Sequence, residues 1–301
     1  MNHARQTLQR MSADGVGFVG DVGNSLSSRL IDQGQSVKVC FLLELLGLTA
    51  ESEAQSLARL ERAISDDSLD ISCTAHAPYS TTPVLIQKIK NRADQQDRIF
   101  SIHTAESRQE TEFLREGTGN FLDFLQERGG WDSTFNVPGM GSVHYLKSLG
   151  VINSKTLCVH VVHVDKEEIE ILASRKAKIC LCPGSNRFLG VGKAPVTEFL
   201  AYGILPALGT DSRASNSILS IWREMRLLRE DHPGLLPATV FSMATRGGAE
   251  AWGIDPELGT LEPGKQAKIL AINCKENTNS TEDVLEFLTT VGESELVEWI
   301  E

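Results

Sequence analysis

The sequence has few aromatic residues, little positive charge and no long apolar run. Aromatic residues make up 6% of the 301 positions, and 29 Lys and Arg stand against 40 Asp and Glu, which gives a net charge of −11. This balance argues against a partner such as nucleic acid or an anionic membrane, because both attract positive charge. No stretch reaches the ~18 apolar residues that span a bilayer. The remaining composition is that of a globular protein.

The six cysteines form no CxxC pair, so a zinc ribbon or a thioredoxin-like site is not expected. We interpret them as free thiols in the core, and reduced thiols predict a cytoplasmic protein. Residues 1–11 lack the apolar core of a signal peptide. The spacing of Ala4, Leu8 and Met11 instead predicts a short helix.

Short apolar runs alternate with helical patterns along most of the chain. Helices are predicted over Glu51–Ile64, Pro83–Ala93, Ser107–Glu116, Asp165–Arg175 and Ser215–Arg229. Such alternation predicts parallel strands joined by right-handed crossovers. The seven predicted strands are Val16–Asp21, Val37–Glu44, Asp70–His76, Ile99–His103, Thr156–His160, Ala177–Cys182 and Ile204–Asp211.

Seven units suit either an open doubly wound sheet or an eight-stranded barrel that lacks one strand. No GxGxxG motif or phosphate loop follows the first run, which disfavours a nucleotide-binding open sheet. Polar residues stand at the carboxyl ends of several strands, and in a barrel these ends meet at one rim. We therefore predict an α/β fold, a (β/α)8 TIM-type barrel lacking its first strand. The polar strand ends are Asp21, Glu44, His76, His103, His160 and Asp211.

The pattern changes near residue 255, so we divide the chain into a barrel (1–255) and an accessory segment (256–301). Residues 267–273 predict one strand, and Ser280–Leu288 and Glu293–Ile300 predict short helices. A lone strand needs a partner. It either joins a small accessory sheet or is a remnant of a small β-sandwich whose other part lies outside this chain.

Four of the strand ends offer chemistry. His103 is followed three residues later by Glu106, which could also be a helix first-turn carboxylate. His160 and His163 are three apart and cannot share one face of a strand, so His163 is either a loop contact or a site residue. Asp211 could cap a helix, and His76 stands in an extended turn. Together, however, histidines and carboxylates on one rim are the ligand and base types of a zinc-type hydrolase.

These motifs resemble the amidohydrolase superfamily, in its chlorohydrolase and aminopurine- or cytosine-deaminase branch. They follow the order of that family over nearly the whole chain. The matching segments are His-Ala-Pro-Tyr-Ser (76–80), His-Thr-Ala-Glu (103–106), His-Val-Val-His-Val-Asp (160–165), Cys-Pro-Gly-Ser-Asn (182–186), Leu-Gly-Thr-Asp-Ser-x-Ala-Ser-Asn (208–216) and Gly-Thr-Leu-Glu-Pro-Gly-Lys (259–265).

The resemblance implies a metal-dependent hydrolysis, with one divalent metal (zinc, or else iron) bound by His103 and Asp211. Glu106 would move protons, and His160 would polarise the attacked centre and steady the nucleophile. Asp211 would be a catalytic residue as well as a metal ligand. The substrate would contact His76, Ser185 and Asn186. The implied reaction is deamination of an aminopurine nucleoside or related heteroaromatic, and the alternative is dechlorination of a triazine-like ring.

The sequence departs from the family in one respect that bears on activity, because no His-x-His occurs in it. This leaves three hypotheses: a fragment of an active deaminase, a shortened binding protein without catalysis, or a site completed by another metal arrangement or a neighbouring subunit. An incomplete barrel has two unpaired strand edges, which favours self-association as a homo-oligomer.

Overall fold

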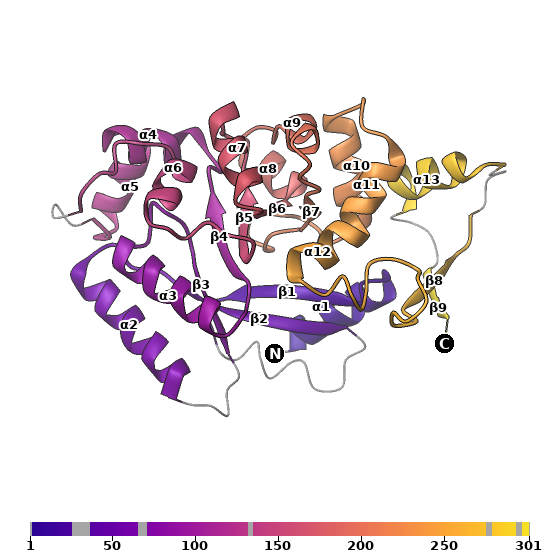
Figure 1. Cartoon of the computed structure of the whole chain (residues 1–301), viewed down its shortest axis with the longest axis horizontal. Coiled ribbons are helices and arrows are strands. Elements are labelled where there is room, and N and C mark those ends of the chain that lie inside the picture. Colours follow the sequence, from indigo (N-terminus) through magenta and orange to yellow (C-terminus); the bar gives the residue numbers. More distant parts are fainter. Residues whose placement is uncertain are drawn as a thin grey trace.

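Seven parallel strands form the centre of the computed structural model, which describes residues 2–25, 37–65, 71–131, 135–274, 279–292 and 297–300. Each of the seven predicted strands overlaps one of them (Figure 1). They are β1 (Phe18–Gly23), β2 (Lys38–Leu45), β3 (Ser72–Ala75), β4 (Phe100–Thr104), β5 (Thr156–His160), β6 (Lys178–Leu181) and β7 (Ala207–Leu208).

The strands follow one another in chain order. One parallel sheet runs β1-β2-β3 and another runs β4-β5-β6-β7. The two sheets meet where the backbone N–H of His103 donates to the carbonyl oxygen of His76 (2.9 Å) and the N–H of Ser101 donates to Oγ1 of Thr74 (2.8 Å). We call this join the β3–β4 seam. The resulting order is that of a TIM-type barrel.

Helices cover the outside of the strands, as Figure 1 shows. The predicted helices match α2, α3, α4 and α7, and α7 opens with a capping box of Asp165 and Glu168. The helices through the barrel region are α1 (Asn2–Ala13), α2 (Ala50–Ser65), α3 (Pro83–Gln95), α4 (Arg108–Glu116), α5 (Asn120–Glu127), α6 (Ser142–Ser148), α7 (Lys166–Ser174), α8 (Pro183–Leu189), α9 (Val196–Ala201), α10 (Ile221–Asp231), α11 (Pro237–Ser242), a π-helix (Met243–Gly247) and α12 (Gly248–Trp252).

The helix predicted over Ser215–Arg229 is wrong at its start, because α10 begins only at Ile221. The hydroxyl of Ser220 accepts the N–H of Arg223 and caps the helix there. Upstream, the side chain of Asn216 donates to the carbonyl oxygen of Thr210 (2.7 Å), which holds the chain in a loop instead.

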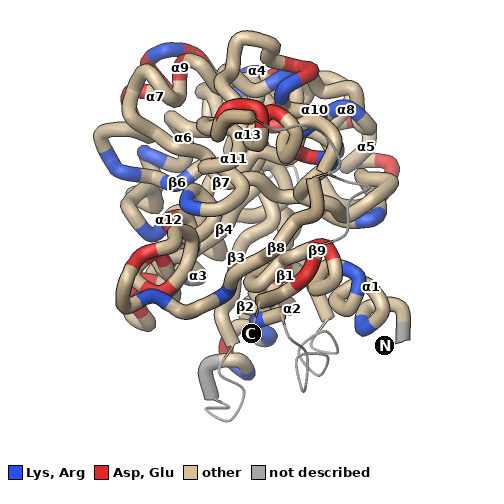
Figure 2. The backbone as a smooth tube through the Cα atoms, turned by 90° about the vertical axis from the view of Figure 1, so that its right-hand side faces the viewer, with Lys and Arg blue, Asp and Glu red and all other residues tan. Residues whose placement is uncertain are grey.

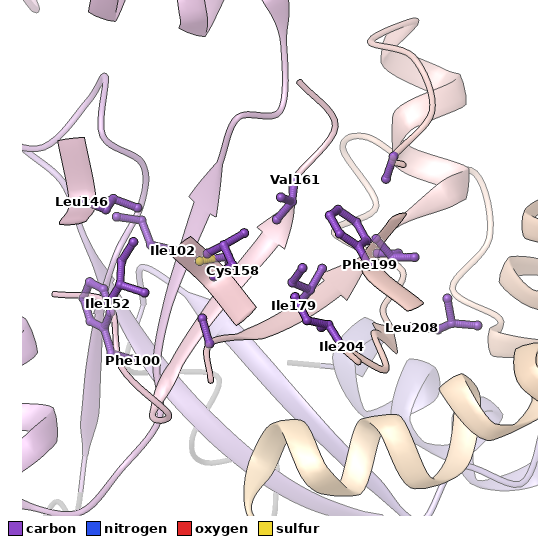
Figure 3. Packing of buried hydrophobic residues seen from close by; sticks show 14 of the residues in the cluster. Phe100, Ile102, Leu146, Ile152, Cys158, Val161, Ile179, Phe199, Ile204 and Leu208 are labelled. Atoms are coloured by element: carbon purple, nitrogen blue, oxygen red, sulfur yellow. The ribbon is translucent and has the colours of Figure 1, made fainter. Parts of the chain in front are cut away.

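Strand side chains alternate between two apolar layers, as the period of two requires. One layer faces the helices, where Leu146 of α6 and Phe199 of α9 pack against it (Figure 3). The strand residues of that layer include Ile102, Cys158, Ile179 and Leu208. The other layer lies on the inner face and includes Leu157, Val159, Cys182 and Ala207.

The segment Met243–Trp252 lies between β7 and β1, the two ends of the strand order. A Cβ at Gly247 would be 2.4 Å from the carbonyl oxygen of Pro206, so backbone touches backbone there. A Cβ at Gly20 of β1 would be 1.7 Å from an indole carbon of Trp252. This segment therefore occupies the interval between β7 and β1, which we expected to be open because the predicted barrel lacks its first strand.

The C-terminal part forms a small antiparallel sheet of β8 (Ile269–Ile272) and β9 (Val297–Ile300), and α13 (Thr281–Thr290) lies between these two strands in the chain. The terminal helix predicted over Glu293–Ile300 is wrong over 297–300, and its first part lies outside the described residues. Val297 and Trp299 alternate with charged or exposed neighbours, which suits a strand. The lone strand predicted at 267–273 thus has its partner within the chain.

Two tryptophan side chains tie the N-terminal segment to this distant part of the chain. The indole N–H of Trp299 donates to the carbonyl oxygen of Ser12 (2.8 Å), and that of Trp222 in α10 donates to the carbonyl oxygen of Asp14 (2.7 Å).

Charged residues lie on the exposed faces of the protein, and acidic residues are prominent on α13 (Figure 2). Among the described residues, no helix combines the length and the apolar character that a membrane crossing needs.

Candidate active site

Five ionisable side chains from consecutive strands meet at the carboxyl end of the barrel. Glu44 belongs to β2, His76 follows β3, His103 belongs to β4, Glu106 follows it, and His160 ends β5. Glu44, His76 and His103 occupy alternate positions to the residues that face the helices, so the pleat directs them inward. His160 has a φ of 69°, and this left-handed conformation turns the chain at the strand end.

The three imidazole rings lie in a row. The centroids of His76 and His103 are 5.2 Å apart, and those of His103 and His160 are also 5.2 Å apart, with the latter pair stacked at 28°. A carboxylate stands beside two of the rings. Oε1 of Glu44 is 3.8 Å from Nε2 of His103, and Oε1 of Glu106 is 3.6 Å from Nε2 of His160.

Hydrogen bonds fix the tautomers of two of these histidines. The hydroxyl of Ser80 donates to the carbonyl oxygen of Ala77, so it accepts from Nδ1–H of His76 (2.6 Å). The amide oxygen of Asn186 accepts from Nδ1–H of His160 (2.9 Å). In both rings the proton is on Nδ1, and Nε2 carries a lone pair.

Two buried imidazole nitrogens of the site, Nδ1 of His103 and Nε2 of His160, have no hydrogen-bond partner among the described residues. A buried polar atom left unpaired costs about 1–3 kcal/mol. Two such atoms in one row of imidazoles indicate a binding site, in which a bound group would supply the missing partners.

The site keeps its histidines in different charge states. Burial, together with the charge of His103, lowers the pKa of His76 to about 4 and that of His160 to about 4, so both are neutral at pH 7. Burial also acts to lower the pKa of His103, but its contact with Glu44 and the charge of Asp211 outweigh burial and raise it. Burial raises the pKa of Glu106, as suits a group that both takes and gives a proton.

Asp211 follows β7 in a left-handed conformation (φ 56°), and its Oδ2 accepts hydrogen bonds from the hydroxyls of Ser185 (2.8 Å) and Ser215. Burial alone would raise the pKa of Asp211, yet these two hydroxyls and the charges of His160 and His103 lower it. Asp211 is therefore a carboxylate at neutral pH, and it is not a helix cap.

A buried carboxylate, Glu224, joins the loop of Asp211 to the start of α8. Its Oε2 accepts from the backbone N–H of Gly184 (2.6 Å), and its Oε1 accepts from the side chain of Asn216 (2.8 Å). Through these contacts Glu224 of α10 holds both loops in register. Nothing in the sequence pattern marks Glu224 as more than a helix residue.

A second buried carboxylate, Glu110, holds the chain at Glu106. Its two oxygens accept the backbone N–H groups of Ala105 and Glu106 (2.8 Å each), and the hydroxyl of Ser142 also donates to it. Glu106 precedes the N-cap Ser107 and is not in the first turn of α4. Sequence reasoning missed Glu110, although its place three residues after a Ser N-cap is a recognisable signal.

The structure brings together four of the site residues expected from the sequence: His76, His103, Glu106 and His160. Ser185 is buried against Asp211 and Asn186 against His160, so both support site residues, and substrate contact by either stays a prediction. The remaining histidine of the motif bonds a loop, because Nε2 of His163 lies 2.6 Å from the carbonyl oxygen of Val191.

Asp21, in contrast, lies inside β1 opposite Phe41 rather than at the strand end. It is therefore about 10 Å below the level of Glu44. Burial raises the pKa of Asp21. Of the six polar strand ends expected at the rim, this one does not reach it.

Two sets of three side chains are placed to hold a cation, and both include His103. One set is Glu44, His76 and His103, and the other is His103, Glu106 and His160; within each set the donor atoms lie within 4.8 Å of one another. Imidazole nitrogen and carboxylate oxygen are donors that zinc accepts. Among the described residues, neither set contains Asp211. The donors present thus fit a divalent metal at His103.

A family model and a curated relative both match most of this chain. A model of the amidohydrolase family matches residues 2–291. A 5′-deoxyadenosine deaminase of Methanothermobacter thermautotrophicus is 32% identical over 258 residues, which are 83% of this chain and 53% of that relative. The chain thus spans about half the length of this curated relative.

Two solved structures share the fold at 25% sequence identity. An adenosine deaminase of Xanthomonas campestris with bound zinc has a TM-score of 0.74, and the match covers 95% of this chain and 65% of that protein. The aminofutalosine deaminase of Helicobacter pylori in complex with methylthio-coformycin has a TM-score of 0.82, and the match covers 94% of this chain and 71% of that protein.

Proposed function

The chain belongs to the amidohydrolase family, and on this basis we propose that it is a metal-dependent hydrolytic deaminase of an adenosine-like nucleoside. The observation that carries the proposal is the pair of Glu106 and neutral His160 beside His103, at the end of neighbouring strands. The names of the similar deaminases support the substrate class. In the reaction, water adds to the ring carbon that bears the amino group, and ammonia leaves.

Each site residue has a separate role in this reaction. Glu106, with its raised pKa, takes one proton from water and delivers it to the ring nitrogen, and the second proton of that water goes to the departing amine. His160 presents an unpaired Nε2 to the reacting centre while Asn186 fixes its ring. His76 contacts the substrate. Asp211 supplies negative charge close to the histidines.

His103 and Asp211 would hold the metal in this scheme. A divalent metal there would supply Lewis acidity, which makes water easier to deprotonate. The division into a barrel (1–255) and an accessory segment (256–301) is part of the proposal, and the pairing of β8 with β9 apart from the parallel sheets supports it.

The test is a substrate panel with the full chain, supplied with zinc. Adenosine, 5′-deoxyadenosine and a chlorotriazine are each incubated with the protein, and ammonia and chloride are measured. We expect ammonia from the nucleosides and none from the Glu106→Gln variant. Chloride release from the triazine would favour the dechlorinase alternative, and neither product would favour a binding protein.

A further inference from the structure

We propose that the thiols of Cys180 and Cys182 together form a binding site for a soft monovalent cation such as Cu⁺. Both cysteines are free, and they stand at alternate positions at the end of one barrel strand. The site shares no residue with the histidines and carboxylates at the rim. The inference does not rest on the proposed function, since it concerns a second ion of a different chemical class.

The pleat of β6 directs both cysteine side chains to the same face. Cys180 lies in β6 and Cys182 follows that strand directly. Ile179 and Leu181, which alternate with them, belong to the layer that faces the helices, so the two thiols point to the inner face of the barrel. Cys182 is buried and Cys180 is partly exposed. An ion can therefore reach the pair from the side of Cys180.

The two sulfur atoms border the same small space beside Gly209. A Cβ on Gly209 would lie 2.7 Å from Sγ of Cys180 and 3.4 Å from Sγ of Cys182, so the absence of a side chain there leaves room next to both sulfurs. The two thiols are also in contact, because a hydrogen bond from Cys180, together with burial, raises the pKa of Cys182. Two metal–sulfur bonds of about 2.3 Å, the length found in zinc sites, join sulfurs up to roughly 4.6 Å apart. One ion can thus bridge the pair.

The donor set selects the class of ion. Thiolate sulfur is a soft ligand that favours Cu⁺ over hard cations such as Mg²⁺. Among the described residues, no histidine, carboxylate or further cysteine joins these two thiols in a group of three possible ligands. Zinc sites supply three or four protein ligands, whereas Cu⁺ accepts two thiolates. On binding, each thiol gives its proton to solvent and forms one sulfur–copper bond, and the copper keeps its oxidation state.

A disulfide between the same residues is less favourable than an ion. Alternate positions of a strand have Cα atoms about 6.6 Å apart. That separation is near the upper limit of about 6.8 Å for a disulfide, whose usual value is about 5.5–6 Å. A disulfide would therefore pull on the backbone of β6, while an ion bridges the sulfurs across the existing separation.

The experiment measures Cu⁺ binding to the full chain in the absence of oxygen. The reduced, metal-free protein is titrated into Cu⁺ held by bicinchoninate, a chelator whose copper complex is coloured, and the loss of colour reports transfer of the ion. We expect the unmodified chain to take up one Cu⁺. Cys180→Ser and Cys182→Ser should each weaken the binding by at least about 100-fold, because loss of even a supporting group costs 10–100-fold at metal sites.

Three further variants test the placement of the site. Gly209→Ala keeps both thiols but fills the space between them and the next strand, so it should also weaken Cu⁺ binding. Cys274→Ser removes another partly exposed thiol and is the matched control, which should bind as the unmodified chain does. His103→Ala removes a metal ligand of the rim and should likewise leave Cu⁺ binding unchanged. Circular dichroism of each metal-free variant checks the fold.

Two results would overturn the proposal. One is failure of the unmodified chain to withdraw Cu⁺ from the chelator. The other is equal affinity in the unmodified chain, Cys180→Ser and Cys182→Ser, which would place the ion elsewhere; loss of binding in His103→Ala alone would assign it to the rim. None of these results bears on ammonia release, so the proposed function is tested separately.

Discussion

Oε1 of Glu106 lies 3.6 Å from Nε2 of His160, and that nitrogen is buried without a hydrogen-bond partner among the described residues. The ring cannot donate to the carboxylate, because its proton is on Nδ1 and bonded to Asn186. Two groups that each offer a lone pair therefore face one another. A proton or a ligand placed between the two atoms would remove the repulsion between their lone pairs. Glu106 is therefore well placed to carry a proton.

Replacement of Glu106 by Gln should abolish proton transfer while the fold persists. General acid–base catalysis contributes about 10²–10⁴-fold, so ammonia release from a nucleoside substrate should fall by that factor. Glu112→Gln, an exposed carboxylate on α4, is the matched control and should keep full activity. Equal rates in both variants would remove Glu106 from the mechanism.

Glu110 should be essential for stability. Its carboxylate accepts from two backbone N–H groups and from Ser142 in a fully buried place, so Glu110→Ala leaves three donors unpaired. At about 1–3 kcal/mol for each unpaired group, the free energy of unfolding should fall by roughly 3 kcal/mol or more. Urea unfolding measures it, with Glu116→Ala on the exposed side of α4 as control. An unchanged midpoint for Glu110→Ala would contradict this account.

Glu224 should make stability depend on pH. Burial raises its pKa to about 7, although the N–H of Gly184 and the amide of Asn216 act to lower it. The folded state thus keeps a proton that the unfolded state loses near pH 4.5. The stabilising effect is complete below pH 4.5, declines as the pH rises towards 7, and is absent above it.

The measurement compares unfolding free energies of the unmodified chain and Glu224→Gln between pH 5.5 and 8.5. The unmodified chain should lose stability relative to the variant up to about pH 7 and then run parallel to it. A difference that stays constant over this range would show that Glu224 has an ordinary pKa.

Gly20 should not tolerate any side chain. A Cβ there would lie 1.7 Å from the indole of Trp252, so Gly20→Ala forces the ring or β1 to move. Overpacking of this kind costs about 1–3 kcal/mol. Gly248→Ala is the control, because nothing lies within 4 Å of its Cβ position, and it should be neutral or slightly stabilising in α12. In a Trp252→Ala background the cost of Gly20→Ala should largely disappear.

Much of the fold follows from local pattern. The apolar runs located all seven barrel strands, and the helical patterns located α2, α3, α4 and α7. The failures have physical causes. Asn216 donates to the carbonyl oxygen of Thr210 and holds the chain in a loop, and Ser220 caps α10, so the helix begins only at Ile221. At the C-terminus, pairing of β9 with β8 and docking of Trp299 overrode a weak helical preference.

The site was predictable only in part. Strand-end position identified His76, His103 and His160 as neighbours because parallel strands deliver their ends to one rim. It could not show that Glu44 faces Nε2 of His103, since that depends on side-chain conformation. Nor could it find Glu110 and Glu224, whose importance comes from burial against backbone N–H groups of other segments.

The two tryptophan hydrogen bonds to the N-terminal segment also bear on the order of assembly. Ser12 and Trp299 are 287 residues apart, and Asp14 and Trp222 are 208 apart. At a synthesis rate of about 5–20 residues per second, roughly 15 to 60 s separate the appearance of Ser12 from that of Trp299. The segment of Ser12 and Asp14 is thus fixed in place only after Trp222 and Trp299 have been synthesised, and such long-range closure slows folding.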